Sequence, residues 1–175
     1  MAAETLQEAA EGLMRTAVSR DMDGTREFEC AAFGGAAIGP PDVAALLGGL
    51  PAELDGQAFV DSLWLEVQEI STIVLSTDED EAMVRSSARV SVDVEDAALR
   101  ELVAAIGREL GADVTEEAVS EVMPGVRAEL ADPGIQMEAT LRVVREDGGW
   151  FVCEVLAIGS SALDEAAADG TDPGG

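Results

Sequence analysis

The clearest periodic pattern in the sequence is AMVRSSARVSVDV, residues 82–94. Apolar residues recur at every second position over most of its length, which is the side-chain period of a β-strand with one buried face. We therefore predict a half-buried strand over 82–94. The residues expected to face the core are Ala82, Val84, Ala88, Val90, Val92 and Val94, and those on the opposite face are Arg85, Arg89, Ser91 and Asp93.

A second strand is predicted directly before it, over residues 63–75. Its alternation of apolar and polar residues slips by one position near Gln68-Glu69. A slip of phase inside a strand indicates a β-bulge. The acidic turn 78–81 then joins the two strands, so we expect them to form a hairpin.

A further hairpin is predicted near the end of the chain. Residues 135–143 alternate, 146–149 form a turn, and 150–158 return as a strand. The residues of its first strand that are expected to face the core are Ile135, Met137, Ala139, Leu141 and Val143.

Helices are predicted in the first fifty residues, where apolar residues recur three and four positions apart. An amphipathic helix covers 4–20 and is expected to end in a turn at 21–24. Two short helices are expected after that turn, one from Thr25 through Phe28 and Phe33, and one over 43–47 capped by Asp42.

A pair of helices is predicted between the two hairpins. The first covers 96–111, and its apolar stripe is Leu99, Leu102, Val103, Ile106 and Leu110. The second starts at Thr115 and is expected to break or kink at Pro124-Gly125, with Val119, Val122 and Met123 facing inward. The order of elements predicts an α+β fold with an antiparallel sheet, as one domain over 1–159 with a helical insertion at about 96–131. We expect the acidic tail, 160–175, to be disordered.

The charge of the chain limits its partners. Acidic residues number 36 against 10 basic residues, all of them arginine, for a net charge of −26. Such a charge repels phosphate backbones and anionic membranes, which argues against binding to nucleic acid or to a lipid surface. It attracts cations or a basic partner, or else it is an adaptation for solubility at high salt or in an acidic medium. No apolar run is long enough for a transmembrane segment, and no signal peptide precedes the domain. The sequence as written therefore predicts a cytoplasmic protein, unless its start is misassigned.

Common catalytic motifs are missing from the sequence. Histidine is absent, which excludes Ser-His and Cys-His pairs. The run Asp21-Met22-Asp23-Gly24 has the start of a calcium loop, but Thr25, Arg26 and Ala32 stand where further ligands and a glycine are needed. We therefore expect no cofactor and no metal site.

The two cysteines, Cys30 and Cys153, have two interpretations. Each is a small buried apolar residue, or the two form one long-range disulfide between the first helical region and the last strand. A disulfide would place the domain outside the cytoplasm.

The weak candidate for a catalytic group is Glu154. If it shares the face of Trp150 and Val152, its carboxylate points at the apolar side of the sheet, where desolvation raises its pKa. The alternative is a bulge that turns Phe151, Cys153 and Val155 inward and Glu154 outward. We expect an apolar ligand pocket to be lined by Trp64, Trp150, Val152 and Leu141, with packing in the core or on the sheet as the alternative role of the tryptophans.

The leading helix, its Gly/Asp turn and the final hairpin VVREDGGWFV, 143–152, resemble the cystatin-like cone superfamily, which includes SnoaL-like and nuclear-transport-factor-like domains. Within it the chain is similar to bacterial lipoprotein-type domains of unknown function. The residues that carry the resemblance are Asp21, Asp23, Cys30, Glu146, Asp147, Gly148, Trp150 and Cys153.

This resemblance implies N-terminal helices packed on a curved antiparallel sheet of about four strands, with a cavity at the open end of the cone. It also favours the Cys30–Cys153 disulfide and a location outside the cytoplasm. Enzymes of the superfamily place Asp, His or Tyr in the cavity, and this chain has neither His nor Tyr. The helical pair at 96–130 departs from the pattern of the superfamily, which usually has a plain connection there.

The leading hypothesis is a non-enzymatic domain that binds a small apolar ligand or a protein partner, with a homodimer through the sheet as one arrangement. The alternatives are a small-pocket cyclase or isomerase-like enzyme that uses carboxylates alone, and a structural module outside the cytoplasm.

Overall fold

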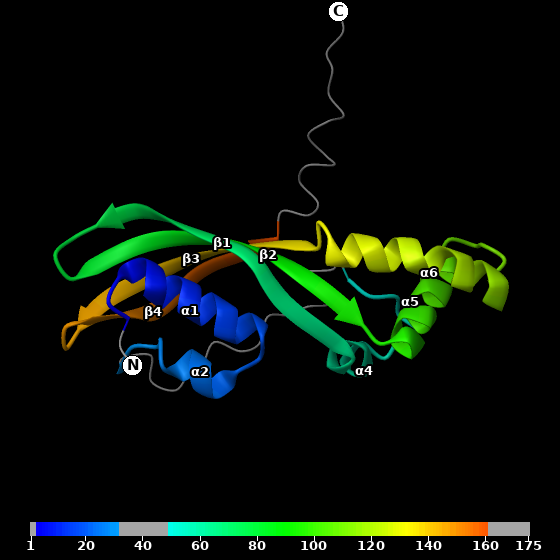
Figure 1. Ribbon diagram of the computed structural model, residues 1–175, viewed down its shortest axis with the longest axis horizontal. Coiled ribbons are helices and arrows are strands. Elements are labelled where there is room, and N and C mark those ends of the chain that lie inside the picture. The colour runs from blue at the N-terminus through cyan, green and yellow to red at the C-terminus, as the bar shows by residue number, and fades with distance from the viewer. Residues whose placement is uncertain (1–2, 32–48, 161–175) are drawn as a thin grey trace, which may run out of the picture.

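Four antiparallel strands lie side by side in their order along the chain, and helices pack against the sheet (Figure 1). The computed structural model describes residues 3–31 and 49–160. The strands are β1 (Leu63–Thr77), β2 (Glu81–Val94), β3 (Ile135–Glu146) and β4 (Gly149–Ser160). The helices are α1 (Leu6–Val18), α2 (Met22–Arg26), α4 (Gly56–Asp61), α5 (Asp96–Glu109) and α6 (Glu116–Ala131). The predicted α+β class is confirmed, with the helical pair α5 and α6 between two hairpins. The helix expected at 43–47, Phe33 and the tail beyond Ser160 lie outside the described residues.

The first hairpin contains the predicted bulge. Val67 pairs with Val90, and the next pair is Glu69 with Arg89, so Gln68 is the extra residue of β1. The bulge lets the apolar positions on both sides of Gln68 face the same side of the sheet.

The apolar residues predicted to face inward on β2 and β3 are buried, which confirms the faces assigned from the sequence. We call this side of the sheet the inner face. α1 lies across it (Figure 1), and its Ala9, Ala10 and Leu13 are fully or almost fully buried. Thr5 and Glu8 form a capping box at the start of α1, which satisfies backbone N–H groups of its first turn. The inward residues of the two strands are Ala82, Val84, Ala88, Val90, Val92, Val94, Ile135, Met137, Ala139, Leu141 and Val143.

The sequence predicted a turn at 21–24 and a helix from Thr25, but α2 already begins at Met22. Asp21 is instead the N-cap of α2, and its carboxylate accepts a hydrogen bond from the Gly24 N–H at 2.9 Å. This local capping explains the acidic residues at this point without a bound calcium ion.

α5 and α6 lie beyond the end of the sheet at which β2 finishes and β3 begins (Figure 1). α6 continues past Pro124 to Ala131, so the helix is not broken at that proline. Gly134 then brings the chain onto β2 with a φ of 70°, and a Cβ there would collide with the carbonyl oxygen of Val90. Only glycine combines this conformation with so close an approach.

The apolar stripes of the helical pair are only partly inward. Leu99, Leu102, Val119 and Met123 are buried, as predicted. In contrast, Ile106, Leu110 and Val122 are 41%, 79% and 51% exposed. The prediction that they face inward is therefore wrong: α6 makes the contacts of the pair with β2, and these three side chains line the open space between the two helices.

Candidate functional site: an apolar groove on the helical pair

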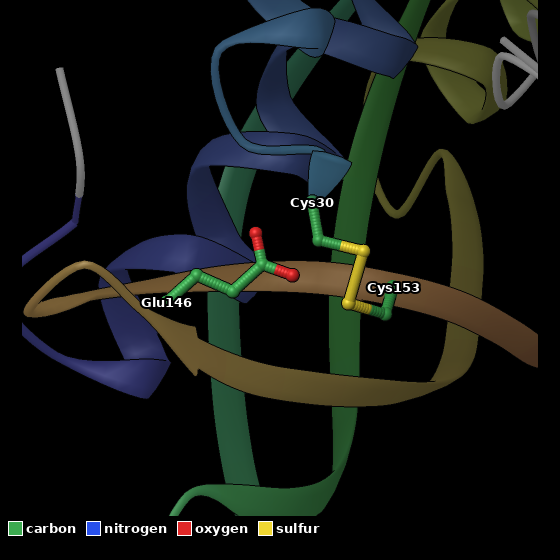
Figure 2. A group of neighbouring side chains, drawn as sticks. All are labelled: Cys30, Glu146 and Cys153. Carbon is green, nitrogen blue, oxygen red and sulfur yellow. A yellow bond between two sulfur atoms is a disulfide. The ribbon is translucent and has the colours of Figure 1, made fainter. Parts of the chain in front are cut away.

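The two cysteines are joined in a disulfide between the segment after α2 and the last strand. Cys30 and Cys153 lie 5.1 Å apart between Cα atoms, and 123 positions separate them in the sequence (Figure 2). The segment before the bond runs parallel to β4, with Glu29 bridged to Val152. Of the two interpretations of the cysteines, the structure therefore supports the disulfide.

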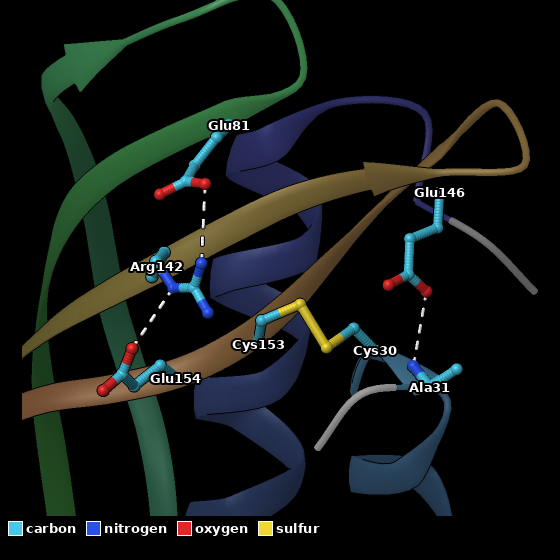
Figure 3. Close-up of a disulfide and its surroundings, with 7 residues drawn as sticks. All are labelled: Cys30, Ala31, Glu81, Arg142, Glu146, Cys153 and Glu154. Atoms are coloured by element: carbon cyan, nitrogen blue, oxygen red, sulfur yellow. Dashed lines mark hydrogen bonds and ion pairs between the residues drawn. A yellow bond between two sulfur atoms is a disulfide. The ribbon is translucent and has the colours of Figure 1, made fainter. Parts of the chain in front are cut away.

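Glu146 is the third potential metal ligand beside the cysteines (Figure 2). Its Oε2 accepts a hydrogen bond from the backbone N–H of Ala31 at 3.3 Å (Figure 3). Metal binding by cysteine requires a thiolate, and both sulfurs here are engaged in the S–S bond. In this state the cluster serves to fix the chain at Ala31 to the turn between β3 and β4.

Glu154 lies on the outer face of the sheet and not on the apolar side. Its carboxylate contacts the Arg142 guanidinium at 3.2 Å, and Arg142 also contacts Glu81 at 3.4 Å (Figure 3). The cause is a bulge in β4, because Val143 pairs with Val152 whereas Arg142 pairs with Glu154. Cys153 is the extra residue, which leaves Val152 inward and turns Glu154 outward. The bulge was anticipated as an alternative, but its position keeps Val152 rather than Cys153 on the inner face.

The four residues of the expected pocket do not meet around a common space. Leu141 and Val152 have no exposed surface and belong to the core. Trp150 is half-buried against that core, near the N-terminus, where its backbone N–H donates to the carbonyl oxygen of Ala3. Trp64 is 60% exposed on the outer face, beside the buried Leu63. None of the four lines the hollows described next.

An inner hollow of about 390 Å³ lies at the end of the sheet where β2 meets the helical pair. Its wall comes from the segment before α4, the ends of β1 and β2, and one side of α5 and α6. Glu109 is the charged side chain among the described residues that line it. The apolar residues of the lining, apart from Gly49, are Leu50, Pro51, Phe59, Leu63, Val92, Val94, Leu102, Ile106, Val126 and Leu130.

An outer hollow of about 250 Å³ lies between α5 and α6. One wall is the α5 stripe, the other is the α6 stripe, and the connection at 112–114 closes one end. Ile106 and Val126 line both hollows, so the apolar surface is continuous from one to the other. We call the two hollows together the apolar groove. The residues that line the outer hollow are Val103, Ile106, Gly107, Leu110, Ala112, Asp113, Val114, Ala118, Val119, Val122 and Val126.

Among the described residues, the charged side chains that line the apolar groove are carboxylates. Asp113 lines the outer hollow and Glu109 the inner one, and no arginine is among the described lining residues of either. The helical pair has three arginines. Arg100 donates to the Ser120 hydroxyl at 3.0 Å and, with Arg108, lines a neighbouring hollow that shares Val114 and Val119 with the outer one. Arg108 pairs with Glu53 at 2.9 Å, and the guanidinium of Arg127 is held by the carboxylates of Asp93 and Asp96. The groove therefore combines an apolar floor with a negative rim.

No protein-family model and no curated protein matches the chain. The site must therefore be interpreted from its own chemistry. Among the described residues the buried polar side chains are Thr25, Ser62 and Ser86, none of which is ionisable. None of the described helices is long and apolar enough to cross a bilayer.

Reasoning from the sequence missed the apolar groove because it treated every apolar residue of the helical pair as core. The number of apolar positions on the two helices could have indicated the groove. Val103, Ile106 and the C-cap Leu110 widen the apolar stripe of α5 beyond its buried residues Leu99, Leu102 and Ala105. An apolar stripe wider than its packing surface indicates an exposed binding face.

Proposed function

We propose that the chain is a binding domain that accommodates an apolar group in the inner hollow. The observation that carries the proposal is the lining, in which one carboxylate accompanies ten apolar residues among those that the structure describes. A volume of about 390 Å³ falls within the range of roughly 300–1,000 Å³ that is typical of ligand sites. An apolar group that leaves water for this hollow gains about 25 cal/mol for each Å² of its surface that is buried.

Binding is favoured over catalysis by the arrangement of the ionisable groups. A carboxylate-based cyclase or isomerase needs an acid or base held against its substrate. Glu109 is exposed at the inner hollow, and Glu154, the candidate from the sequence, is paired with Arg142 on the outer face. Among the described residues, neither has a second ionisable group beside it in the inner hollow, as such a mechanism requires.

We further propose that the domain is a member of the cystatin-like cone superfamily. The support is the placement of α1 across the inner face of an antiparallel sheet that ends in the EDGGW hairpin. The helical pair α5 and α6 is the departure from that plan, and it supplies two walls of the apolar groove. In this proposal the insertion is the part of the domain that has acquired the binding site.

The test is titration with a neutral, environment-sensitive dye such as Nile red, which the protein's negative charge does not repel. We expect saturable binding that the Val126→Trp variant weakens at least about tenfold, a loss of about 1.4 kcal/mol, because the indole fills space beside both hollows. Val122→Trp, one turn earlier on α6, lines only the outer hollow and is the matched control for position. Val74→Trp on β1 lines neither hollow. Equal affinity of the dye for all four proteins would overturn the proposal, provided that circular dichroism confirms their folding.

A further inference from the structure

From the shape and charge of the apolar groove we infer its occupant, and this inference rests on the proposed binding function. We propose that the outer hollow docks a basic amphipathic α-helix of a partner protein. The apolar face of that helix lies between α5 and α6, and its lysines or arginines face the carboxylates of the rim.

The walls of the outer hollow have the spacing of a helix-binding groove. Val103, Ile106 and Leu110 lie three and four residues apart on α5, and Ala118, Val122 and Val126 lie four apart on α6. Each wall is about two helical turns long, or about 11 Å. A third helix packs its ridge of side chains into such a groove with anchors at i, i+3 or i+4, and i+7.

The exposure of these residues indicates that the described part of the chain leaves the groove open. Leu110 is 79% exposed and Val122 51% exposed, one on each wall. Leucine and valine at this exposure lose contact with water when a helix docks, and burial of their apolar surface favours the complex. The two positions therefore serve as the apolar anchors of the interface.

The charges identify the sign of the partner. Asp113 and Glu109 line the hollows, and among the described residues no arginine forms an ion pair with either. The chain as a whole has a net charge of −26, so a second copy or an acidic helix meets strong repulsion as it approaches. A basic helix is attracted over the same distance, and electrostatic complementarity speeds its association.

The probe for the experiment is a labelled peptide of about 18 residues, or about five helical turns, made of leucine and lysine with leucines at helical spacing. Two reference peptides have the same length. One has the same composition in an order without helical spacing, and the other has glutamate in place of lysine. Binding is followed by fluorescence anisotropy, and the helix content of the peptide by circular dichroism.

The decisive variant is Leu110→Glu, because the two explanations of peptide binding predict opposite changes in affinity for it. It removes an apolar anchor and adds a negative charge. If the groove docks the helix, affinity falls at least about tenfold. If the peptide merely responds to negative charge, affinity rises or stays the same. Ile73→Glu on β1, a site of similar chemistry at 54% exposure and outside the groove, adds the same charge and should not weaken binding.

The outcomes separate this inference from the proposed function. Tight binding of the spaced leucine–lysine peptide, lost in Leu110→Glu and weak for both reference peptides, supports the docked helix. Equal binding of the unspaced or the glutamate peptide overturns it. Self-association in sedimentation that Leu110→Glu abolishes also overturns it, because a second copy then covers the groove. Failure of the peptide while Nile red still binds refutes the helix alone, and failure of both refutes the proposed function as well.

Discussion

The backbone N–H of Cys30 donates to the carbonyl oxygen of Val152 at 3.0 Å, and the side chain of Cys30 is bonded to the next residue, Cys153. A hydrogen bond and a covalent bond thus hold one short segment to the edge of β4. The backbone N–H of Val152 in turn donates to the carbonyl oxygen of Phe28 at 2.8 Å. The ring of Phe28 lies directly on Gly12 of α1, where a Cβ would collide with it. The sheet edge, the disulfide and α1 therefore form one connected unit.

We expect the disulfide to be the largest contribution of this unit to the free energy of unfolding. In the chain-entropy model, a bond between residues 123 positions apart stabilises the folded state by about 5 kcal/mol. The double variant Cys30→Ser/Cys153→Ser should therefore unfold at a much lower denaturant concentration than the oxidised wild type. The measurement is urea unfolding followed by circular dichroism.

The control for the disulfide is a thiol count on unfolded protein with and without reductant. Protein prepared under oxidising conditions should show no free thiol until it is reduced. Two reactive thiols before reduction would contradict the bond and would weaken the expectation that the domain works outside the cytoplasm.

Two residues that the sequence placed in one pocket should respond very differently to truncation. Leu141 has no exposed surface, so Leu141→Ala leaves a cavity in the core and should cost about 2–5 kcal/mol. Trp64 is 60% exposed on the outer face, and Trp64→Ala should cost less than about 1 kcal/mol. The free energy of unfolding of both variants tests this. Similar losses at the two sites would mean that Trp64 is covered in solution.

The ion pair between Glu154 and Arg142 should contribute little to stability. Both side chains are partly exposed, 52% and 38%, and their distance is 3.2 Å. Ion pairs of this kind are worth about 0–1 kcal/mol. A double-mutant cycle with Glu154→Gln and Arg142→Gln should give a coupling energy within that range and diminish with added salt. A coupling above about 2 kcal/mol would indicate that the carboxylate is shielded from water.

Two glycines of the helical pair should respond to alanine in opposite directions. Neither Gly125 nor Gly111 has an atom within 4 Å of an added Cβ, so the backbone alone sets the effect. Gly125 is inside α6, and Gly125→Ala should stabilise the protein by about 0.5–1 kcal/mol. Gly111 has a φ of 72° after the end of α5, and Gly111→Ala should destabilise it.

Thermal unfolding of the two glycine variants gives the sign directly. The pair controls for composition, because each adds one methyl group to the same region of the chain. If Gly111→Ala also stabilised the protein, the left-handed conformation at that position would be wrong.

The strands were predictable because their period is fixed by backbone geometry. The alternation in 82–94 and 135–143 placed the residues on the correct faces, and the slip near Gln68 located one of the two register shifts of β1. For the bulge at Cys153 in β4, the sequence suggested a bulge but not its position. Phe151, Val152 and Cys153 are all apolar, so the sequence gives no alternation from which to choose the extra residue.

The apolar groove was not predictable in the same way, because it depends on how much of α5 and α6 the sheet can cover. Leu99 and Ile106 have similar apolar side chains on one helix, yet one is buried and the other is 41% exposed. The difference arises from the placement of the pair at the end of the sheet, where α6 contacts β2 and Ile106 faces the open space between the two helices. Sequence spacing identifies an apolar stripe, but tertiary packing determines which part of it is covered.

The disulfide also determines how the chain would carry a mechanical load. Tension applied to the two ends of the chain unravels residues on either side of the cross-link and then passes through the Cys30–Cys153 bond. The residues between the cysteines lie outside that path. They include β1, β2, β3 and the helical pair, and therefore the whole apolar groove. While the bond is intact, a pull on the chain cannot extend the binding site; once the bond is reduced, the same pull can unfold it.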